Sequence, residues 1–318
     1  MNTAIGQRSG RSPSLFGTGQ RSRRDLALSL AQYFYQKRTT IIPLQTPSSS
    51  CPLSIVCISD THTTQPVVPD GDLLLHAGDL TNSGSFEELQ AQINWLKSLP
   101  HKHKIVIAGN HDRLLDPAYV DRFPDRICEG IGTSRSDLDW GDVVYLNNSS
   151  AHLNFDNGRT LTVYGSPWTP LCGTFAFQYP DIRPVWHGAV PPNTDILLTH
   201  GPPKGHLDDG GKGCPQLLQE IWRTRPRLVV FGHIHPGHGI EHVEFDTFQG
   251  AYDAVVTGDK GLLAVLLMAC LWIGERLWTF MTSRQNKRCR TSRGTTLVNA
   301  AVVVGRNYQV QPAIVVSI

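Results

Sequence analysis

The stretch LVVFGHIHPGHG, from Leu228 to Gly239, joins an apolar run directly to a cluster of histidines. The run LVVF has the length and composition of a buried β-strand. Gly232 follows it and allows the backbone to turn sharply. His233 and His235 are two residues apart, so in extended backbone both side chains point to the same side. Taken alone, the stretch fits a polar His-rich loop as well as a strand that delivers two imidazole ligands to a metal site.

Five further apolar runs of strand length also end in polar clusters. They are LSIVCIS before Asp60, DLLLHA before Gly78, KIVIA before Gly109, LTVYGS before Pro167 and DILLT before His200. Such continuous apolar runs are typical of strands buried on both faces. Between the second and third runs, SFEELQAQINWLKSLP has helical spacing, a capping box at Ser85 and Glu88, and a stop at Pro100. The pattern predicts an α/β layered fold in which the polar strand ends meet at one edge.

The polar residues at these strand ends are of types that bind metal ions. In chain order they are Asp60, His62, Asp79, Asn110, His111, His200, His233 and His235. Oxygen and imidazole ligands without a thiolate suit Mn, Fe, Zn or Ni rather than a structural cysteine-bound zinc. Each short motif is common by itself as a turn or a cap. Five of them in order, each after a predicted strand, indicate one shared metal site.

This ordered set resembles the calcineurin-like metallophosphoesterase superfamily, whose pattern is D-x-H, GD, GNH, H and GHxH. Here it reads DTH (60–62), GD (78–79), GNHD (109–112), TH (199–200) and GHIH (232–235). The stretches GSPWTP (165–170) and RPRLVVFGHIH (225–235) look like the branch called metallophosphoesterase domain-containing proteins. The resemblance implies a four-layer α/β/β/α sandwich, in which two packed mixed β-sheets are flanked by helices and a dinuclear metal site lies at the carboxyl ends of the strands.

The resemblance also implies two divalent metal ions (Mn, Fe, Zn or similar) and assigns their ligands. One ion would bind Asp60, His62, Asp79 and His235, and the other would bind Asp79, Asn110, His200 and His233. A hydroxide that bridges the ions would attack the phosphorus of a phosphoester. His111 would bind the phosphate or protonate the leaving alkoxide, and is the expected catalytic residue.

Asn82 and Trp168 are the predicted substrate contacts. Many family members carry an acid at the position of Asn82, where it orients the catalytic histidine. An amide cannot stabilise an imidazolium by charge, which leaves open how His111 is oriented. Asp112 is expected to cap the next turn. Trp168 and the aromatic stretch 175–179 are candidates either for a wall of the substrate pocket or for packing over the core.

We expect a hydrolase that acts on small, nucleotide-like phosphodiesters. A serine/threonine phosphoprotein phosphatase on the same metal core is an alternative. A weakly active or non-catalytic metal-binding scaffold is another, although scaffolds usually lose ligands and none is missing from the motifs here.

Charge is distributed unevenly along the chain. The formal net charge is +2, yet residues 1–50 and residues 282–318 carry +6 each, which leaves −10 for residues 51–281. An acidic middle argues against binding of polymeric nucleic acid and suits a site that concentrates cations. Seven cysteines without a CxxC pair predict reduced thiols in an intracellular, cytoplasmic protein.

Residues 1–50 are expected to form a basic, disordered extension, and residues 51–318 the metallophosphoesterase domain. The extension is acid-poor and contains DLALSLAQYFYQKR, which could form an amphipathic helix, so a mitochondrial transit peptide is the alternative. Residues 252–296 are predicted to be an insertion. Within it, GLLAVLLMACLWI (261–273) is shorter than the roughly 20 residues of a membrane span. We expect this segment to be buried, with contact to a membrane interface as the alternative.

Overall fold

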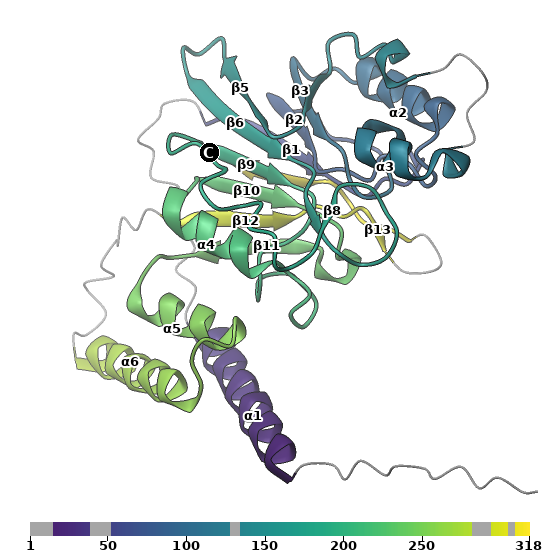
Figure 1. The fold of residues 1–318 in the computed structure, drawn as a ribbon. Coiled ribbons are helices and arrows are strands. Elements are labelled where there is room, and N and C mark those ends of the chain that lie inside the picture. The colour runs from purple at the N-terminus through teal and green to yellow at the C-terminus, as the bar shows by residue number, and fades with distance from the viewer. Residues whose placement is uncertain (1–14, 39–51, 128–133, 282–293, 305–308) are drawn as a thin grey trace, which may run out of the picture. The chain divides into compact units, whose positions relative to one another are not determined.

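The computed structural model describes residues 15–38, 52–127, 134–281, 294–304 and 309–318. These residues belong to two compact units (Figure 1). The larger unit is formed by residues 40–245 and 289–318 and holds every strand of the described ranges. The smaller unit is formed by residues 1–39 and 246–288, whose described parts are helical.

The larger unit is built on two mixed β-sheets. The first has the strand order β15-β1-β2-β3-β4, with β1 Ser54–Ile58, β2 Leu73–His76, β3 His103–Ile107, β4 Val144–Leu146 and β15 Ile314–Ser317. The second has the order β11-β12-β10-β9-β6-β5, with β5 Ser149–Asn154, β6 Thr160–Ser166, β9 Ile196–Thr199, β10 Leu228–Phe231, β11 Gly239–Val243 and β12 Thr295–Asn299. In each sheet the central strands run parallel, whereas β15, β5 and β11 are antiparallel to their neighbours.

Two short pairs of strands and several helices complete this unit. The pairs are β7 Thr169–Pro170 with β8 Gln178–Tyr179, and β13 Val303–Val304 with β14 Gln309–Val310. The helices are α2 Phe86–Ser98, α3 Pro117–Arg122 and α4 Pro215–Thr224, with 3₁₀ turns η1 Arg113–Leu115, η2 Pro124–Arg126, η3 Arg135–Asp137 and η4 His235–Gly237.

The predicted start of α2 is confirmed at Ser85, whose side chain accepts a hydrogen bond from the backbone N–H of Glu88. The Glu88 carboxylate in turn accepts from the backbone N–H groups of Ser83 and Gly84. These bonds satisfy donors that a helix start leaves without intrahelical partners.

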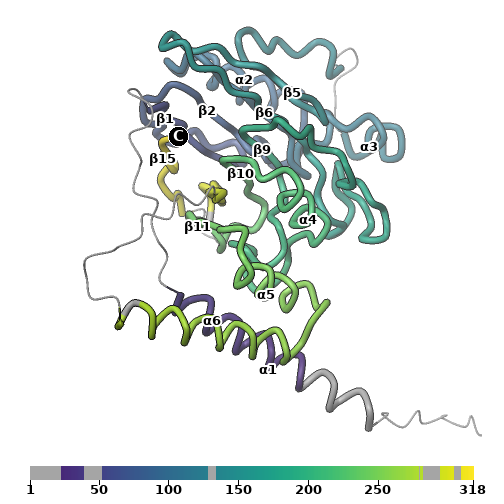
Figure 2. The backbone as a smooth tube through the Cα atoms, turned by 90° about the vertical axis from the view of Figure 1, so that its left-hand side faces the viewer, coloured from purple at the N-terminus to yellow at the C-terminus, as the bar shows by residue number. Residues whose placement is uncertain are grey.

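Alternate residues of the strands face opposite sides of each sheet, and both sides are covered. Between the sheets, Ile55 and Leu75 of the first pack with Leu198 and Val230 of the second in one buried cluster. The outer face of the first sheet packs against α2, and that of the second packs against α4. The predicted arrangement of two packed mixed sheets flanked by helices is therefore confirmed, and Figure 2 shows the backbone of the same strands turned by 90° from Figure 1.

The smaller unit contains α1 Leu15–Lys37, α5 Thr247–Val256 and α6 Leu262–Met281. Its core combines Ala31 of α1 with Tyr252 of α5 and Met268 of α6. Tyr35 and Tyr252 stack with ring centroids 3.9 Å apart. No helix in the described ranges combines the length and the hydropathy that crossing a bilayer requires.

Two predictions concern segments of this smaller unit. The amphipathic helix considered for residues 25–38 lies within α1 up to Lys37, whereas residues 1–14 and 39–50 of the predicted extension are outside the described residues. The predicted insertion 252–296 contains the end of α5 and all of α6, and its residues 282–293 are likewise outside the described part. The domain boundaries stay predictions.

The buried carboxylate of Glu220 provides a test of the contacts around α4. It accepts hydrogen bonds from the Val190 backbone N–H at 2.9 Å and from Arg223 at 2.6 and 2.9 Å. Burial opposes ionisation, but these bonds outweigh it and hold the pKa of Glu220 below its ordinary value. We expect Glu220→Gln to lower the free energy of unfolding at pH 7 by about 1–2 kcal/mol.

The pH dependence of this loss has a defined sign. Because the folded pKa is depressed, the stabilisation is complete above the unfolded pKa of about 4.3 and disappears as pH falls through the folded value. Urea unfolding should therefore show the two proteins converging in strongly acidic solution. The exposed Asp121 offers the control Asp121→Asn, with an expected change within about 0.5 kcal/mol. A Glu220→Gln protein as stable as the wild type at pH 7 would contradict the assignment.

Candidate metal centre

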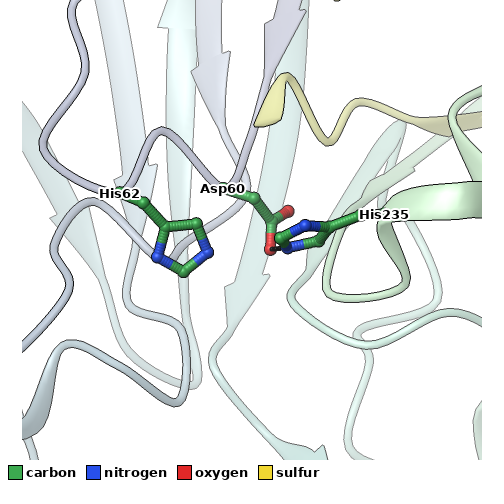
Figure 3. Close-up of side chains that lie close together, drawn as sticks. All are labelled: Asp60, His62 and His235. Atoms are coloured by element: carbon green, nitrogen blue, oxygen red, sulfur yellow. Dashed lines mark hydrogen bonds and ion pairs between the residues drawn. The ribbon is translucent and has the colours of Figure 1, made fainter. Parts of the chain in front are cut away.

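The carboxyl ends of strands from both sheets bring the predicted ligands together. Asp60, His62 and His235 form one group, and Asp79, His200 and His233 form a second. Within each group the potential ligand atoms lie within 4.8 Å of one another. Figure 3 shows the Asp60 carboxylate between the rings of His62 and His235. Each group contains three of the four ligands of one set that the resemblance implies.

The seventh predicted ligand and the predicted catalytic histidine adjoin these groups. The side-chain oxygen of Asn110 lies 3.1 Å from Nε2 of His200. His111 forms a third group with His62 and Asp79, again within 4.8 Å. All eight motif residues therefore lie around one place in the larger unit.

Hydrogen bonds fix how two of the histidines present their nitrogens. Nδ1 of His200 lies 2.8 Å from the carbonyl oxygen of Ala77, and Nδ1 of His62 lies 3.2 Å from that of Thr81. A carbonyl only accepts, so each Nδ1 must carry the proton and donate. Nε2 then remains as the site for a cation or a proton. Bonding of the second ring nitrogen to a carbonyl is typical of metal-binding histidines.

The Nε2 atoms face buried carboxylates. Nε2 of His200 lies 3.3 Å from Asp79 Oδ2, and Nε2 of His235 lies 3.1 Å from Asp60 Oδ1. A nitrogen lone pair that faces a carboxylate oxygen this closely is repelled unless a proton or a metal ion lies between them. The donor set and its geometry therefore fit divalent cations.

The pKa values show how strongly this place attracts positive charge. Burial disfavours ionisation of Asp60 and Asp79, but the surrounding histidines outweigh it and lower the pKa of both carboxyls. Burial likewise disfavours a charged His200, yet Asp79 and Asp60 raise its pKa to about 9. Desolvation and the neighbouring His200 lower the pKa of His233 to about 4, so it stays neutral at pH 7. Two carboxylates that stay ionised when buried need compensating cations.

Backbone strain is concentrated at the same residues. Asp60, His62, Asp79 and His233 have positive φ angles of 53°, 43°, 54° and 65°. Non-glycine residues rarely adopt this region, and each such residue costs about 1–3 kcal/mol. The strain is sustained by hydrogen bonds: the backbone N–H of His233 donates to the Asp60 carboxylate at 2.9 Å, and that of His111 donates to Asp79 at 2.7 Å.

Asp112 has a larger role than the predicted turn cap. Its carboxylate makes no capping bond at η1. It accepts instead from the backbone N–H groups of Gly109 at 2.7 Å, Thr81 at 3.0 Å and Leu80 at 3.2 Å, and from the Thr81 hydroxyl at 2.8 Å. These bonds tie the loop after β2 to the loop after β3, which fixes the loop of Asp79 against that of Asn110. Sequence reasoning missed this role because it depends on a contact between loops.

His111 is oriented by the main chain of Asn82. Its Nδ1 donates to the backbone carbonyl of Asn82 at 2.8 Å. The Asn82 side chain points elsewhere and donates to the carbonyl of His62 and to the hydroxyl of Thr63. A backbone carbonyl can orient His111 without any acid, and this answers the question that the asparagine raised.

The aromatic ring next to His111 belongs to Phe175, with ring centroids 4.9 Å apart. The loop that carries Phe175 is held by a bond from the Ala176 backbone N–H to the Asn110 carbonyl at 3.1 Å. Trp168 packs edge-on against Tyr179 and lies under the Arg183 guanidinium. The substrate contacts predicted for Asn82 and Trp168 stay predictions.

The remaining histidines of the motif region have other partners. His76 is fully buried and bonds to the Thr61 hydroxyl and the Gly78 N–H, and burial lowers its pKa to about 3. His238 donates to the Ala301 carbonyl, and the buried His206 pairs with Glu241. None of these three belongs to the ligand groups of the described residues.

Comparison with known proteins gives a family match. Residues 53–237 match the family described as "Calcineurin-like phosphoesterase". This range is more than half of the chain and includes every predicted ligand. The resemblance on which the sequence analysis relied is thereby confirmed.

Three curated relatives show how far the similarity extends. The chain is 44% identical to "Probable rhamnogalacturonate lyase C" of Emericella nidulans over 91% of its own length, but spans only 26% of that protein. It is 37% identical to a UPF0046 protein of Caenorhabditis elegans over 61% of this chain and 68% of that one. It is 35% identical to "Metallophosphoesterase domain-containing protein 1" of Homo sapiens over 63% of this chain and 65% of that one.

The close packing of Gly232 provides a test of the first ligand group. A Cβ at this position would lie 2.0 Å from Asp60 Oδ2 and 2.1 Å from Ser59 Oγ, so Gly232→Ala must displace the carboxylate. We expect the affinity for Mn²⁺, measured by titration calorimetry, to fall at least about tenfold. Gly261→Ala is the matched control, because nothing lies within 4 Å of its added Cβ. Equal Mn²⁺ affinity in both variants would show that Asp60 is not a ligand.

Proposed function

Since the chain belongs to the calcineurin-like phosphoesterase family, we propose that it is a metal-dependent hydrolase of small, nucleotide-like phosphodiesters. The observation that carries the proposal is the placement of His111 beside two groups of ligand atoms that share a buried, strongly acidic centre. One relative is itself named a metallophosphoesterase domain-containing protein.

We assign the ligands in two overlapping sets. Asp60, His62 and His235 would hold one divalent ion, and Asn110, His200 and His233 would hold the other, with Asp79 between them. Asp79 is suited to this shared place because its Oδ2 is approached by both His62, at 3.8 Å, and His200, at 3.3 Å. When bound, such a pair of ions supplies Lewis acidity toward the phosphoryl group and the attacking water.

The residues of the chain provide orientation around this centre. The Asn110 amide contributes a neutral oxygen, so the set has only two carboxylates to offset four positive charges and attracts an anionic phosphoester. The main-chain bonds of His62 and His200 hold their rings before any cation binds, which lowers the entropy lost on binding.

His111 is placed to act on the substrate. Its Nδ1 donates to Asn82, and no described residue is recorded as a hydrogen-bond partner of its Nε2. Nε2 is therefore available to a phosphoryl oxygen or to the oxygen of the leaving alcohol, which it would protonate. Phe175, half-buried beside His111, offers an apolar contact for the organic part of a diester.

The main experiment compares esters in the presence of added metal. Purified protein with Mn²⁺ should hydrolyse bis(p-nitrophenyl) phosphate faster than p-nitrophenyl phosphate or a phosphoserine peptide. Asp79→Asn should reduce both the bound Mn²⁺ and kcat, the latter by about 100-fold or more. Asp121→Asn, at an exposed position, is the control and should retain both.

The possible results separate the candidate functions. Activity on the phosphopeptide alone would identify a phosphoprotein phosphatase. Tight binding of Mn²⁺ without hydrolysis of any of the three esters would identify a non-catalytic metal-binding protein. Either result would overturn the proposal.

A second experiment tests the role of His111 and of the main chain at Asn82. His111→Ala should lower kcat about 100-fold or more, because the group that binds or protonates is lost. Asn82→Ala keeps the backbone carbonyl that orients the ring, so kcat should fall less than about tenfold. The exposed His187 provides the control His187→Ala. Equal losses in Asn82→Ala and His111→Ala would show that the Asn82 side chain takes part directly.

A further inference from the structure

The helical unit is formed by α1, α5 and α6. One side of α6 packs into the core of this unit, and another side exposes large apolar side chains. The exposed face of α6 contains six large apolar residues with exposed fractions between 42% and 83%: Leu263, Leu266, Leu267, Leu277, Trp278 and Met281. We call this set the α6 face. Contiguous apolar surface on a helix usually marks an interaction site.

The spacing of these residues places them on one side of the helix. At 3.6 residues per turn, all six fall within about a third of the helix circumference. The opposite side packs into the unit through Ala264, Val265 and Met268. The two charged residues of α6, Glu275 and Arg276, fall outside the stripe by the same spacing. The stripe is thus apolar along the whole helix.

The charge of the helical unit indicates which kind of partner binds the α6 face. Residues 1–39 and 246–288 together contain twelve Lys or Arg and five Asp or Glu, a formal charge of +7. The remaining residues then carry −5, since the whole chain carries +2. Directly after Met281 the chain continues through Arg284, Lys287 and Arg288 without an acidic residue. Basic residues that flank an apolar helical face are typical of helices bound to anionic lipid surfaces.

The composition of the α6 face also favours a lipid surface. Trp278 of the α6 face lies near the end of α6 that leads into the basic segment, and aromatic rings are enriched at the boundary between headgroups and hydrocarbon. Like the other described helices, α6 lacks the combination of length and hydropathy that crossing a bilayer requires. A second copy of the chain is a poorer partner, since its helical unit carries the same +7 charge.

We propose that the α6 face binds the surface of membranes that contain anionic lipid, with the helix lying along the surface. The proposal is independent of the phosphoesterase function, because none of the residues involved belongs to the metal centre.

The test uses the full chain and sedimentation with vesicles of phosphatidylcholine, with and without phosphatidylserine. Wild-type protein should bind the phosphatidylserine vesicles, and high salt should weaken the binding by screening. The double variant Leu266→Glu, Leu277→Glu should bind at least about tenfold more weakly, because two apolar contacts are replaced by like-charged repulsion. Its Mn²⁺ affinity should be unchanged, which shows that the larger unit is intact.

A matched double variant, Leu171→Glu with Ile182→Glu, controls for added negative charge. Both residues belong to the larger unit and are 63% and 92% exposed. This control should bind vesicles within about threefold of the wild type, since only the added charge acts. Wild-type protein that does not sediment with phosphatidylserine vesicles, or equal loss in both double variants, would overturn the proposal. So would light scattering that shows a dimer which Leu266→Glu, Leu277→Glu converts to monomers, since the face would then join two copies.

Discussion

The structure of the metal centre depends on the burial of two ionised carboxylates, Asp60 and Asp79, side by side. Neither has an arginine or lysine partner among the contacts of the described residues, and both are surrounded by imidazoles. Burial of a charge is costly unless an opposite charge or several hydrogen bonds compensate it. Here the backbone N–H groups of His111 and His233 supply part of the compensation, and His200, whose Nε2 lies 3.3 Å from Asp79 Oδ2, supplies more when it is protonated. A divalent cation bound between these carboxylates and imidazoles would therefore stabilise the folded site.

The rest of the larger unit keeps these two groups in place. Both aspartates, together with His62 and His233, have positive φ angles, which would relax if the loops were free. They do not relax because Asp112 binds the loops after β2 and β3 together, and because Gly109 and Gly232 allow backbone to lie against the carboxylates. The parallel strands provide the common edge, and the cores on both faces of each sheet make that edge rigid.

The helical unit differs from the larger unit in its core and in its charge. Its core is small, and the apolar surface of α6 exceeds what that core covers. The unit is also basic, whereas the remainder of the chain is acidic. The chain thus combines a cation-attracting centre in one unit with a helix suited to anionic surfaces in the other. If both proposals hold, the phosphoesterase centre would be carried on a membrane-bound protein.

The sequence by itself determined six strands of the two sheets, the order of the ligand motifs and the family, because apolar runs and motif spacing are local properties of the chain. These strands are β1, β2, β3, β6, β9 and β10. The sequence also indicated a helix near residues 25–38. Only the tertiary structure decided that Asp112 ties two loops, that the Asn82 carbonyl orients His111, and that Phe175 is the residue of the aromatic stretch 175–179 whose ring lies beside His111. These contacts join residues separated by 29 to 64 positions, or use main-chain atoms that every residue possesses, so no residue pattern could reveal them.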